Sequence, residues 1–277
     1  MSEIVLHIRP DDLDLIKYGI VTSDLKVTKG NSLIQRSLYT MNIIEHRIVL
    51  FLIAKVNPWD DDLLSYQFDI NQFCTICGLD SRGGKTYARI RDALKNLYEQ
   101  SFWVYLEDGR KTLVKWISRP FIDEKRGYFD VRLDELMRPY LLDLKGKFTS
   151  YSLVYTLAMR STYSIRLYEL LKSYENMGAF TIDIETLKEK IGAMNYQRYA
   201  DFKKRALIPA LKEIFMLTDL TVSWAESKKG NRVVAVLFRI NLKSSLELEK
   251  VHTTVGERLK RASLDDIPIL AEQQTEC

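Results

Sequence analysis

The 277-residue sequence has little cysteine, little histidine and no long hydrophobic run. Its three cysteines are too few for a disulfide framework in a chain of this length, and they indicate a reducing compartment. The longest apolar run covers residues 48–54, far short of the ~20 residues that cross a membrane. The first residues lack the pattern of a secretory signal. We therefore expect a cytoplasmic protein with no membrane segment.

The few histidines also argue against a metal centre and against catalysis. His7, His46 and His252 are scattered singly, and Cys74 and Cys77 form one isolated pair without nearby histidines. We therefore expect these two cysteines to be core residues. No nucleophile stands beside a base and an orienting group. The sequence predicts a protein that is not an enzyme and needs neither a metal nor a cofactor.

Residues 83–86, with the sequence Gly-Gly-Lys-Thr, resemble the end of a phosphate-binding loop. That loop requires four residues between its first glycine and Gly-Lys-Thr, whereas Gly78 leaves five and position 79 is leucine. A predicted helix, not a strand, precedes the segment. We therefore expect no nucleotide site here.

Positive charge is modest overall but concentrated in two windows. The formal net charge is +4, which by itself does not indicate a polyanionic partner. Residues 85–119 hold eight basic and four acidic side chains, and residues 198–232 hold the same numbers. Two separated basic stretches are what surfaces that face phosphates need, although ordinary solvated faces remain the alternative.

The spacing of apolar residues predicts a similar order of elements in both halves. In the first half we expect an arm over 1–30, one long helix over 31–56, a strand over 66–70, a short helix over 71–79, a helix over 85–100, a hairpin around residues 108–109 and a strand over 128–133. In the second half we expect helices over 149–161 and 163–176, a strand over 180–184, a short helix over 184–192, a basic helix over 196–215 and a hairpin from 220 to 240.

Direct comparison of the halves indicates an internal repeat. Five positions of the first half match residues 114 positions later, namely Asp69, Ile70, Phe73, Cys77 and Gly78. Residues 93–95 match residues 210–212. Strand, short helix, turn, long helix and hairpin is the order of a winged helix-turn-helix. The sequence thus predicts an α+β fold of two tandem winged helix-turn-helix domains related by duplication, with a kink at Pro209.

A helical wheel selects candidate DNA-binding residues on the second long helix. Its apolar side gathers Tyr199, Ala206, Ala210 and Ile214. Because recognition helices read bases with their N-terminal residues, base contacts are expected from Arg198, Asp201, Lys204 and Arg205, with Gln197 nearby and Lys212 reaching phosphate. The hairpin adds Lys228, Lys229, Asn231 and Arg232 as phosphate or minor-groove candidates. The parallel set in the first half is Lys85, Arg89, Lys95, Arg110 and Lys111.

Three segments resemble the Rep_3-type plasmid replication initiators, which have two tandem winged helices and bind iterated origin repeats. These segments are LKGKFTSYSL (144–153), YSIRLYELLKSY (163–174) and YQRYADFKKRALIPALKEI (196–214) with its hairpin to Ile240. Weaker similarity extends the match to about residues 31–243. The family tolerates proline at the position of Pro209, and residues 1–30 and 244–277 lie outside the resemblance.

The resemblance implies a bacterial initiator that binds origin repeats of double-stranded DNA as a monomer and helps to open the duplex. It also implies recruitment of a host initiator, helicase and chaperones, and repression of its own gene as a dimer. On this basis we predict an N-terminal arm (1–30), a first domain for dimerisation and DNA-backbone contacts (31–145), a second domain as the main sequence reader (146–243) and a polar tail (244–277). Helices in successive major grooves predict a site of roughly 20 bp.

Three alternatives remain open at this stage. A dimeric winged-helix repressor without initiator activity would share the fold. A rolling-circle nuclease would need a tyrosine and two closely spaced histidines, which are absent. The aromatic residues Trp103, Tyr105, Trp116 and Trp224 could stack on melted single strands, although residues of this kind more often belong to the core.

Overall fold

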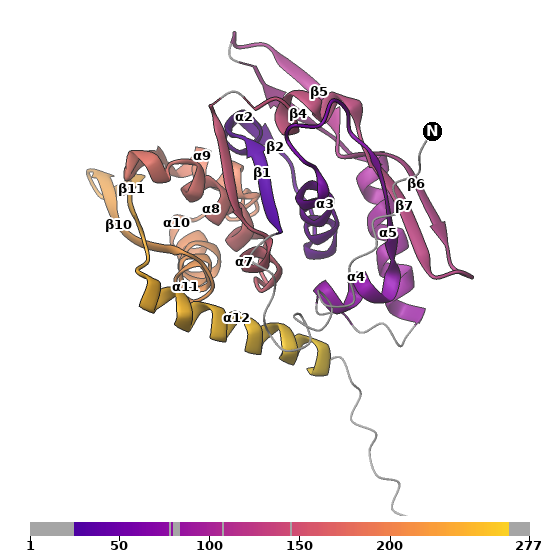
Figure 1. The fold of residues 1–277 in the computed structure, drawn as a ribbon. Helices are drawn as coiled ribbons and strands as arrows, with labels where there is room; N and C mark the ends of the chain where they lie inside the picture. The colour runs from indigo at the N-terminus through magenta and orange to yellow at the C-terminus, as the bar shows by residue number, and fades with distance from the viewer. Residues whose placement is uncertain (1–24, 78, 80–83, 107, 145, 266–277) are drawn as a thin grey trace, which may run out of the picture.

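The computed structural model describes residues 25–77, 79, 84–106, 108–144 and 146–265 (Figure 1). Two α/β lobes lie side by side, and a two-stranded ribbon formed by β1 (Lys26–Gly30) and β8 (Phe148–Ser152) runs between them. Since these strands come from residues more than a hundred positions apart, the ribbon ties the start of the first lobe to the start of the second.

The first lobe combines helices with two small antiparallel sheets. Its helices are α2 (Asn31–Arg36), α3 (Ile43–Lys55), α4 (Ile70–Cys77), α5 (Gly84–Glu99), the 3-10 turn η1 (Glu135–Met137) and α6 (Arg138–Leu141). One sheet has the order β2-β4-β5 and the other β3-β7-β6. Their strands are β2 (Ser37–Leu38), β3 (Ser65–Asp69), β4 (Ser101–Tyr105), β5 (Lys111–Lys115), β6 (Ile117–Asp123) and β7 (Tyr128–Leu133).

The second lobe has a helical bundle and one antiparallel sheet of order β10-β11-β9. Its helical elements are α7 (Leu153–Leu157), α8 (Thr162–Ser173), η2 (Glu175–Met177), α9 (Ile184–Ile191), α10 (Tyr199–Phe202), η3 (Lys203–Leu207) and α11 (Ile208–Leu217). Its strands are β9 (Ala179–Asp183), β10 (Leu220–Lys229) and β11 (Arg232–Leu242). A last helix, α12 (Ser245–Asp265), lies along α11 and α7.

The predicted repeat is visible in the bounds of the elements. β3 and α4 begin at Ser65 and Ile70, and β9 and α9 begin 114 residues later, at Ala179 and Ile184. Each pair is followed by a longer helix and a hairpin, so both lobes have the order of a winged helix-turn-helix. The sheets of the two lobes differ: β9 pairs with the hairpin strand β11, whereas β3 pairs with β7 in a separate sheet.

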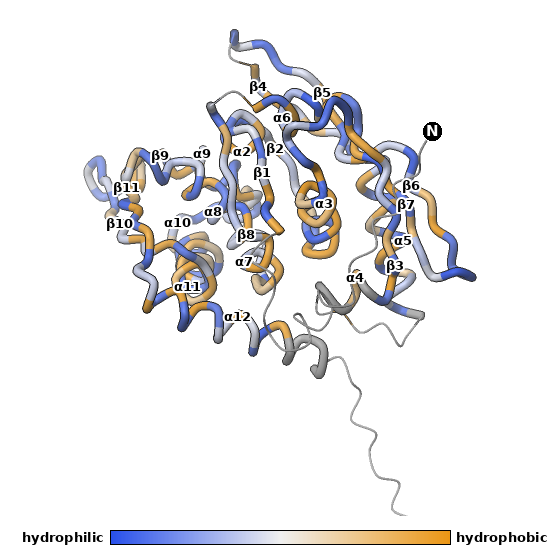
Figure 2. Tube along the Cα trace, in the orientation of Figure 1, coloured by the Kyte–Doolittle hydropathy of each residue, from blue (hydrophilic) through white to orange (hydrophobic). Residues whose placement is uncertain are grey.

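One apolar core runs through both lobes. Figure 2 shows hydrophobic residues gathered on the inner sides of α3, α8 and α11, and hydrophilic residues at the hairpin tips. Helix α3 is buried over almost its whole length, because the ribbon, α5 and α7 pack around it. The aromatic rings of Phe51, Phe68, Phe73 and Phe129 meet in the first lobe at centroid distances of 5.0 to 5.7 Å.

The prediction of one continuous helix over 31–56 is wrong. The chain leaves α2 at Arg36, passes through β2 and starts a new helix at Ile43. Asn42 caps α3, since its side chain accepts hydrogen bonds from the backbone N–H groups of Ile44 and Glu45, and the Glu45 carboxylate accepts one from the N–H of Asn42. The sequence contains this capping box as the pattern Asn-x-x-Glu. The expectation of one continuous helix rested on the spacing of apolar residues and did not take this pattern into account.

Two further segments differ from the sequence expectation. The predicted helix over 149–161 begins as strand β8, which pairs with β1, and becomes helical only at Leu153. Much of the segment 244–277, expected to be a polar tail, forms α12, whose Val251 and Val255 are buried. Valines four residues apart lie on the same side of a helix, and that side packs on the second lobe.

Candidate nucleic-acid interface

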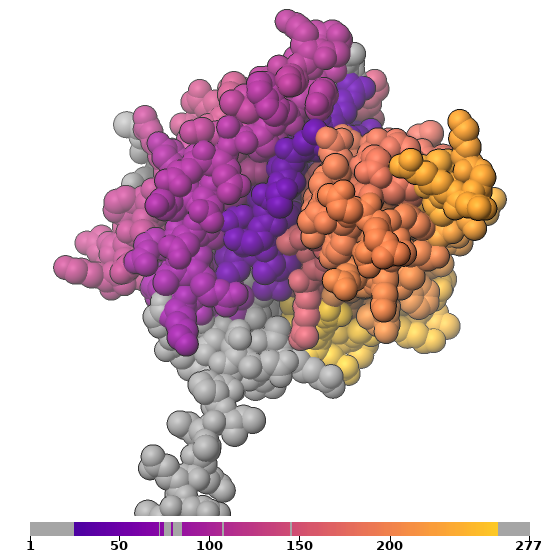
Figure 3. Space-filling model, turned by 180° about the vertical axis from the view of Figure 1, so that it is seen from behind, coloured from indigo at the N-terminus to yellow at the C-terminus, as the bar shows by residue number. Residues whose placement is uncertain are grey.

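The long helices of the two repeats lie on one side of the molecule. Figure 3 shows this side, with the first-lobe segment around α5 in magenta and the second-lobe segment around α10 and η3 in orange. The indigo band between them comes from the start of the described chain. Two helices on one side, each followed by a hairpin, form an arrangement that can meet two neighbouring grooves of a duplex.

The predicted first-lobe set is exposed on α5 and its hairpin, namely Lys85, Arg89, Lys95, Arg110 and Lys111. Two of these side chains already have acidic neighbours. Lys95 Nζ lies 3.9 Å from the Glu99 carboxylate, and Arg110 lies 2.7 Å from that of Asp108. The Lys111 ammonium group lies 4.5 Å from the centre of the Trp103 ring. All five can approach a ligand from solvent.

Apolar packing and polar contacts hold α5 in place, among them one between Arg91 and the Glu124 carboxylate at 3.3 Å. Ile90, Leu94 and Leu97 face the core at helical spacing and are buried. Near the C-terminal end of the helix, Asn96 Nδ2 donates to Glu45 Oε1 at 3.0 Å, the same carboxylate that closes the capping box of α3. The start of α3 therefore sets the position of α5.

The sequence predicted a kink at Pro209, and the structure has a wider helical turn just before this residue. A π-helical turn, η3, lies between α10 and α11, and the N–H of Ile208 donates to the carbonyl of Lys203, five residues earlier. Pro209 has no N–H, and its ring would crowd the carbonyl of Arg205 in a regular helix. The wider turn is one of the recognised ways in which a helix accommodates such a clash. It contains Lys204 and Arg205, two of the residues expected to read bases.

The predicted second-lobe set is also on the outside. Ala206, Ala210 and Ile214 are buried, as the wheel predicts. The exposed residues are Gln197, Arg198, Lys204, Arg205, Lys212, Lys228, Lys229, Asn231 and Arg232, and Asp201 is half-buried. Among the residues that the structure describes, neither Lys204 nor Arg205 forms an ion pair. The set has the exposure that DNA contact requires, and its role remains a prediction.

An ion pair and a hydrogen bond that join the second helix to its hairpin were not predicted from the sequence. We call these contacts the tether. Lys203 Nζ lies 2.7 Å from Glu226 Oε1 and 5.2 Å from the Trp224 ring centre, and Tyr199 Oη donates to the same oxygen at 2.7 Å. Hydrogen bonds from Lys203 and Tyr199 hold the pKa of Glu226 below its usual range. Trp224 and Glu226 are two residues apart on β10, so alternation along the strand places both on one face.

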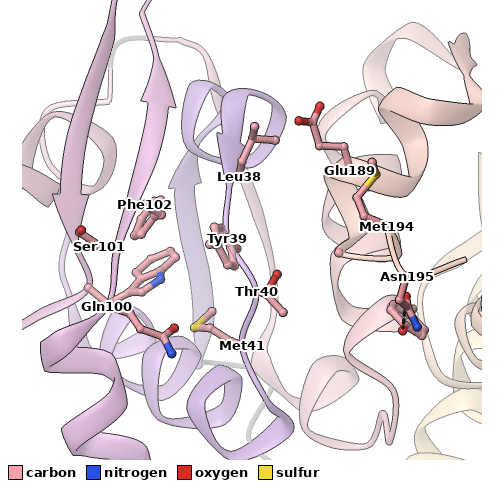
Figure 4. A pocket seen from close by; sticks show the side chains of 13 residues that line it. Leu38, Tyr39, Thr40, Met41, Gln100, Ser101, Phe102, Glu189, Met194 and Asn195 are labelled. Carbon is pink, nitrogen blue, oxygen red and sulfur yellow. Dashed lines mark hydrogen bonds between the residues drawn. The ribbon is translucent and has the colours of Figure 1, made fainter.

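A cavity of about 740 Å³ opens between the two lobes. Figure 4 shows its walls: Tyr39, Thr40 and Met41 approach from the first lobe, and Glu189, Met194 and Asn195 face them from the second. It also reaches the end of α5 at Gln100 and the loop that leads to α10. We call the candidate DNA-binding residues of each lobe, on its long helix and hairpin, the reading surface of that lobe. The two reading surfaces are therefore separated by open space on this side of the molecule.

The remaining features singled out in the sequence are the cysteine pair, the Gly-Gly-Lys-Thr segment and four aromatic residues. Cys74 is buried in α4, while the side chain of Cys77 lies outside the described part. Of the Gly-Gly-Lys-Thr segment, Gly83 lies outside the described part, and Gly84, Lys85 and Thr86 begin α5. Trp116 is a core residue and Trp224 is half-buried, whereas Trp103 and Tyr105 are exposed, against the expectation of core residues.

Neither a metal cluster nor a membrane span is found in the described ranges. Within them, no group of three or more His, Cys, Asp or Glu side chains is arranged to hold a metal ion. No helix there is long and apolar enough to cross a bilayer.

Comparison with known proteins identifies the family. Residues 26–172 match the family model described as "Initiator Replication protein, WH1", and residues 183–240 match "Initiator Rep protein, WH2". The chain belongs to this family of replication initiators. The two winged-helix matches confirm the predicted fold class.

Individual members of the family are distant in sequence. A "Replication initiation protein" of Escherichia coli is 24% identical over 243 residues, covering 82% of this chain and 72% of the relative. The E. coli "PI protein" is 28% identical over 153 residues, 50% of this chain and 46% of that protein. An uncharacterized 27.6 kDa E. coli protein is 23% identical over 55% of this chain and 66% of its own length. The chain thus spans somewhat less than half of the PI protein and about two thirds of the 27.6 kDa protein.

A solved structure of an initiator shares the fold. The crystal structure of the Pi initiator protein in complex with iteron DNA superposes with a TM-score of 0.67 at 19% identity, covering 81% of this chain and all of that one. At this identity the likeness establishes the fold of both winged-helix domains. The DNA in that complex belongs to the Pi initiator.

Proposed function

We propose that this chain is a plasmid replication initiator that binds origin repeats as double-stranded DNA. The observation that carries the proposal is the placement of two exposed basic helices, each followed by a hairpin, on one side of the molecule. Two helices in successive major grooves, about 10 bp apart, define a site of roughly 20 bp. The Pi initiator, which shares the fold, was solved with iteron DNA.

In this proposal the second lobe is the main sequence reader. Arg198, Lys204 and Arg205 are exposed, and donate to guanine N7 and O6. Asp201 accepts from cytosine N4. Gln197 supports them, Lys212 contacts phosphate, and the hairpin residues follow the backbone or the minor groove. The first-lobe set adds contacts to the DNA backbone.

Selection of binding sites from a random duplex pool tests this proposal at two salt concentrations. Wild-type protein is expected to enrich one element of about 20 bp. Lys204→Ala and Arg205→Ala should each weaken binding to it by about 10-fold and relax one base position. Lys250→Ala on α12 is the matched control, since it removes the same charge from an exposed helix outside the proposed interface. Equal loss in the control, or no enrichment, would refute specific reading.

Beyond binding, the proposed initiator opens the duplex as a monomer and recruits a host initiator, helicase and chaperones. The name of one relative, a "Replication initiation protein", and the descriptions of both family models support an initiator over a plain repressor. Permanganate footprinting on an origin fragment separates the two functions. Unpaired thymines beside the bound repeats are expected for an initiator, whereas protection without unpairing favours a dimeric repressor.

Autorepression as a dimer requires a surface for self-association, and the outer side of the β4–β5 hairpin fits it. Trp103 and Leu113 face each other across the strands and are 41% and 44% exposed, with Tyr105 beside them. An exposed apolar sheet face of this kind is typical of a contact surface. Sedimentation of Trp103→Ser/Leu113→Ser should show a weaker dimer with unchanged unfolding. An unchanged association constant would exclude this face.

A further inference from the structure

The two lobes meet across a cluster of charged side chains that water does not reach. Lys29 on β1 is 1% exposed and Glu169 on α8 is completely buried, and their charged atoms are 2.6 Å apart. Tyr151 on β8 donates to the same oxygen of Glu169. On the other oxygen, Arg166 lies 3.8 Å away. The side chains of the cluster come from the two strands of the ribbon, β1 and β8, and from α8 of the second lobe.

Arg166 connects both lobes through a single side chain. Its guanidinium lies 3.9 Å from the centre of the Tyr39 ring and donates to the carbonyl of Ser37 at 3.4 Å, both in the first lobe. Its Nε donates to the carbonyl of Lys190, at the end of α9, at 3.0 Å. Because the planar guanidinium has donors in fixed directions, these contacts are compatible with one relative placement of the lobes.

Other polar contacts across the junction agree with this placement. Arg47 on α3 donates to the carbonyl of Leu157 at 3.2 Å, and Gln35 on α2 donates to the hydroxyl of Ser173 at 3.0 Å. All of these contacts run from the first lobe to the second. On the side of the reading helices, by contrast, the lobes are separated by the cavity of about 740 Å³ (Figure 4).

The buried charges oppose any movement of one lobe relative to the other. Burial by itself raises the pKa of Glu169, but Lys29 and Arg166 outweigh this effect and hold it below its usual range, so the carboxylate is charged. A shift of the lobes would leave that charge buried without its partners, which is far more costly than sliding one apolar surface over another. A buried ion pair adds little net stability compared with an apolar pair, and in some proteins it specifies one arrangement of the parts that it joins.

We propose that the cluster of Lys29, Arg166 and Glu169 fixes the distance and angle between the two reading surfaces, so that the protein selects the spacing between the halves of its DNA site. These are positioning residues, since none lies on the proposed DNA-binding surface. The inference rests on the proposed function, because it requires both lobes to contact one duplex. It adds a source of specificity that does not depend on base contacts.

The test measures affinity against spacer length. Adding two base pairs between the half-sites of the selected element rotates one half by about 70° and moves it by about 7 Å. Wild-type protein should then bind about 100-fold more weakly, because one set of base contacts is lost. In Lys29→Met/Arg166→Met/Glu169→Met, apolar side chains replace all three charged members of the cluster, so no lone charge is left. This variant should lose less than about 10-fold on insertion while binding an isolated half-site as wild type does.

A matched control uses an ion pair on the same helix that does not cross the junction. Lys172 on α8 contacts Asp219 at 2.6 Å within the second lobe. Lys172→Met/Asp219→Asn should keep the full 100-fold penalty of the insertion. The conservative variant Arg166→Lys retains the positive charge but loses the planar contact with Tyr39, and it should relax the spacing dependence in part.

The possible outcomes distinguish failure of the proposed function from failure of the inference that the buried cluster sets the spacing. If the wild-type protein enriches no bipartite element, the proposed function fails before any variant is compared. If it does, but the variant without the Lys29, Arg166 and Glu169 charges keeps the wild-type spacing penalty, the inference is wrong. Loss of binding to the isolated half-site would also overturn it, because the cluster would then maintain the fold of a lobe and not the placement of two.

Discussion

Burial of His46 predicts that acid weakens the fold in a pH range where few other groups titrate. His46 lies on α3, its Nδ1 lies 3.2 Å from the carbonyl oxygen of Asn42, and burial lowers its pKa to about 4. In the unfolded chain the same imidazole titrates near pH ~6.5. The unfolded state therefore binds the proton more readily, and stability falls as pH drops from about 6.5 towards 4.

The size of the effect follows from the two pKa values. A difference of about 2.5 units corresponds to about 3 kcal/mol once the pH is below both values. Between pH 7 and pH 5 the loss is about 2 kcal/mol, since most of the titration of the unfolded state lies in that interval. Above pH ~7 the imidazole is neutral in both states and contributes no pH dependence.

Urea unfolding at pH 7 and pH 5 measures this loss, with the fluorescence of buried Trp116 as a probe of the first lobe. His46→Phe keeps an aromatic ring and removes the titration, so its free energy of unfolding should change by about 2 kcal/mol less than that of wild type. His252→Phe is the control, because His252 is exposed on α12. If His46→Phe retains the full loss, the buried imidazole is not its source.

Two further substitutions test the supports of the reading helices. Asn42→Ala removes the cap of α3 and should lower the free energy of unfolding by about 1 kcal/mol, measured by urea denaturation; no change would contradict the capping role. Glu226→Gln weakens the tether to Lys203 and Tyr199, and should reduce affinity for the isolated second half-site by about 5-fold without altering base preference. A changed base preference would instead mean that Glu226 contacts DNA.

The parts of the fold that were predicted are those with strong local signals. Strand β7 was expected over 128–133 and has those bounds, and the hairpin around residues 108–109 is present with Gly109 at a positive φ of 85°. The repeat offset located β9 and α9 because short elements of fixed length follow one another closely. Exposure of the candidate DNA-binding residues followed from helical periodicity, which needs no knowledge of the partner surface.

The missed elements depend on contacts that are distant in sequence. Strand β8 looks helical because residues 149–152 acquire their extended form from pairing with β1, more than a hundred residues earlier. The break before α3 allows β2 to pair with β4 and brings Tyr39 under Arg166. Pairing between distant segments overrides local propensity, which is a weak determinant of strands.

The buried charges at the junction illustrate a second limit of sequence analysis. Lys29, Arg166 and Glu169 resemble ordinary surface residues in a sequence, because residues of these types are almost never fully buried unless they are paired. Glu169 lies three residues after Arg166 on α8, which by itself suggests an exposed pair on one helix. Only the ribbon that brings Lys29 to the same helix makes the pair an interior one. Residues that orient two domains are therefore least visible in a sequence, since their role arises from the placement of the domains that they maintain.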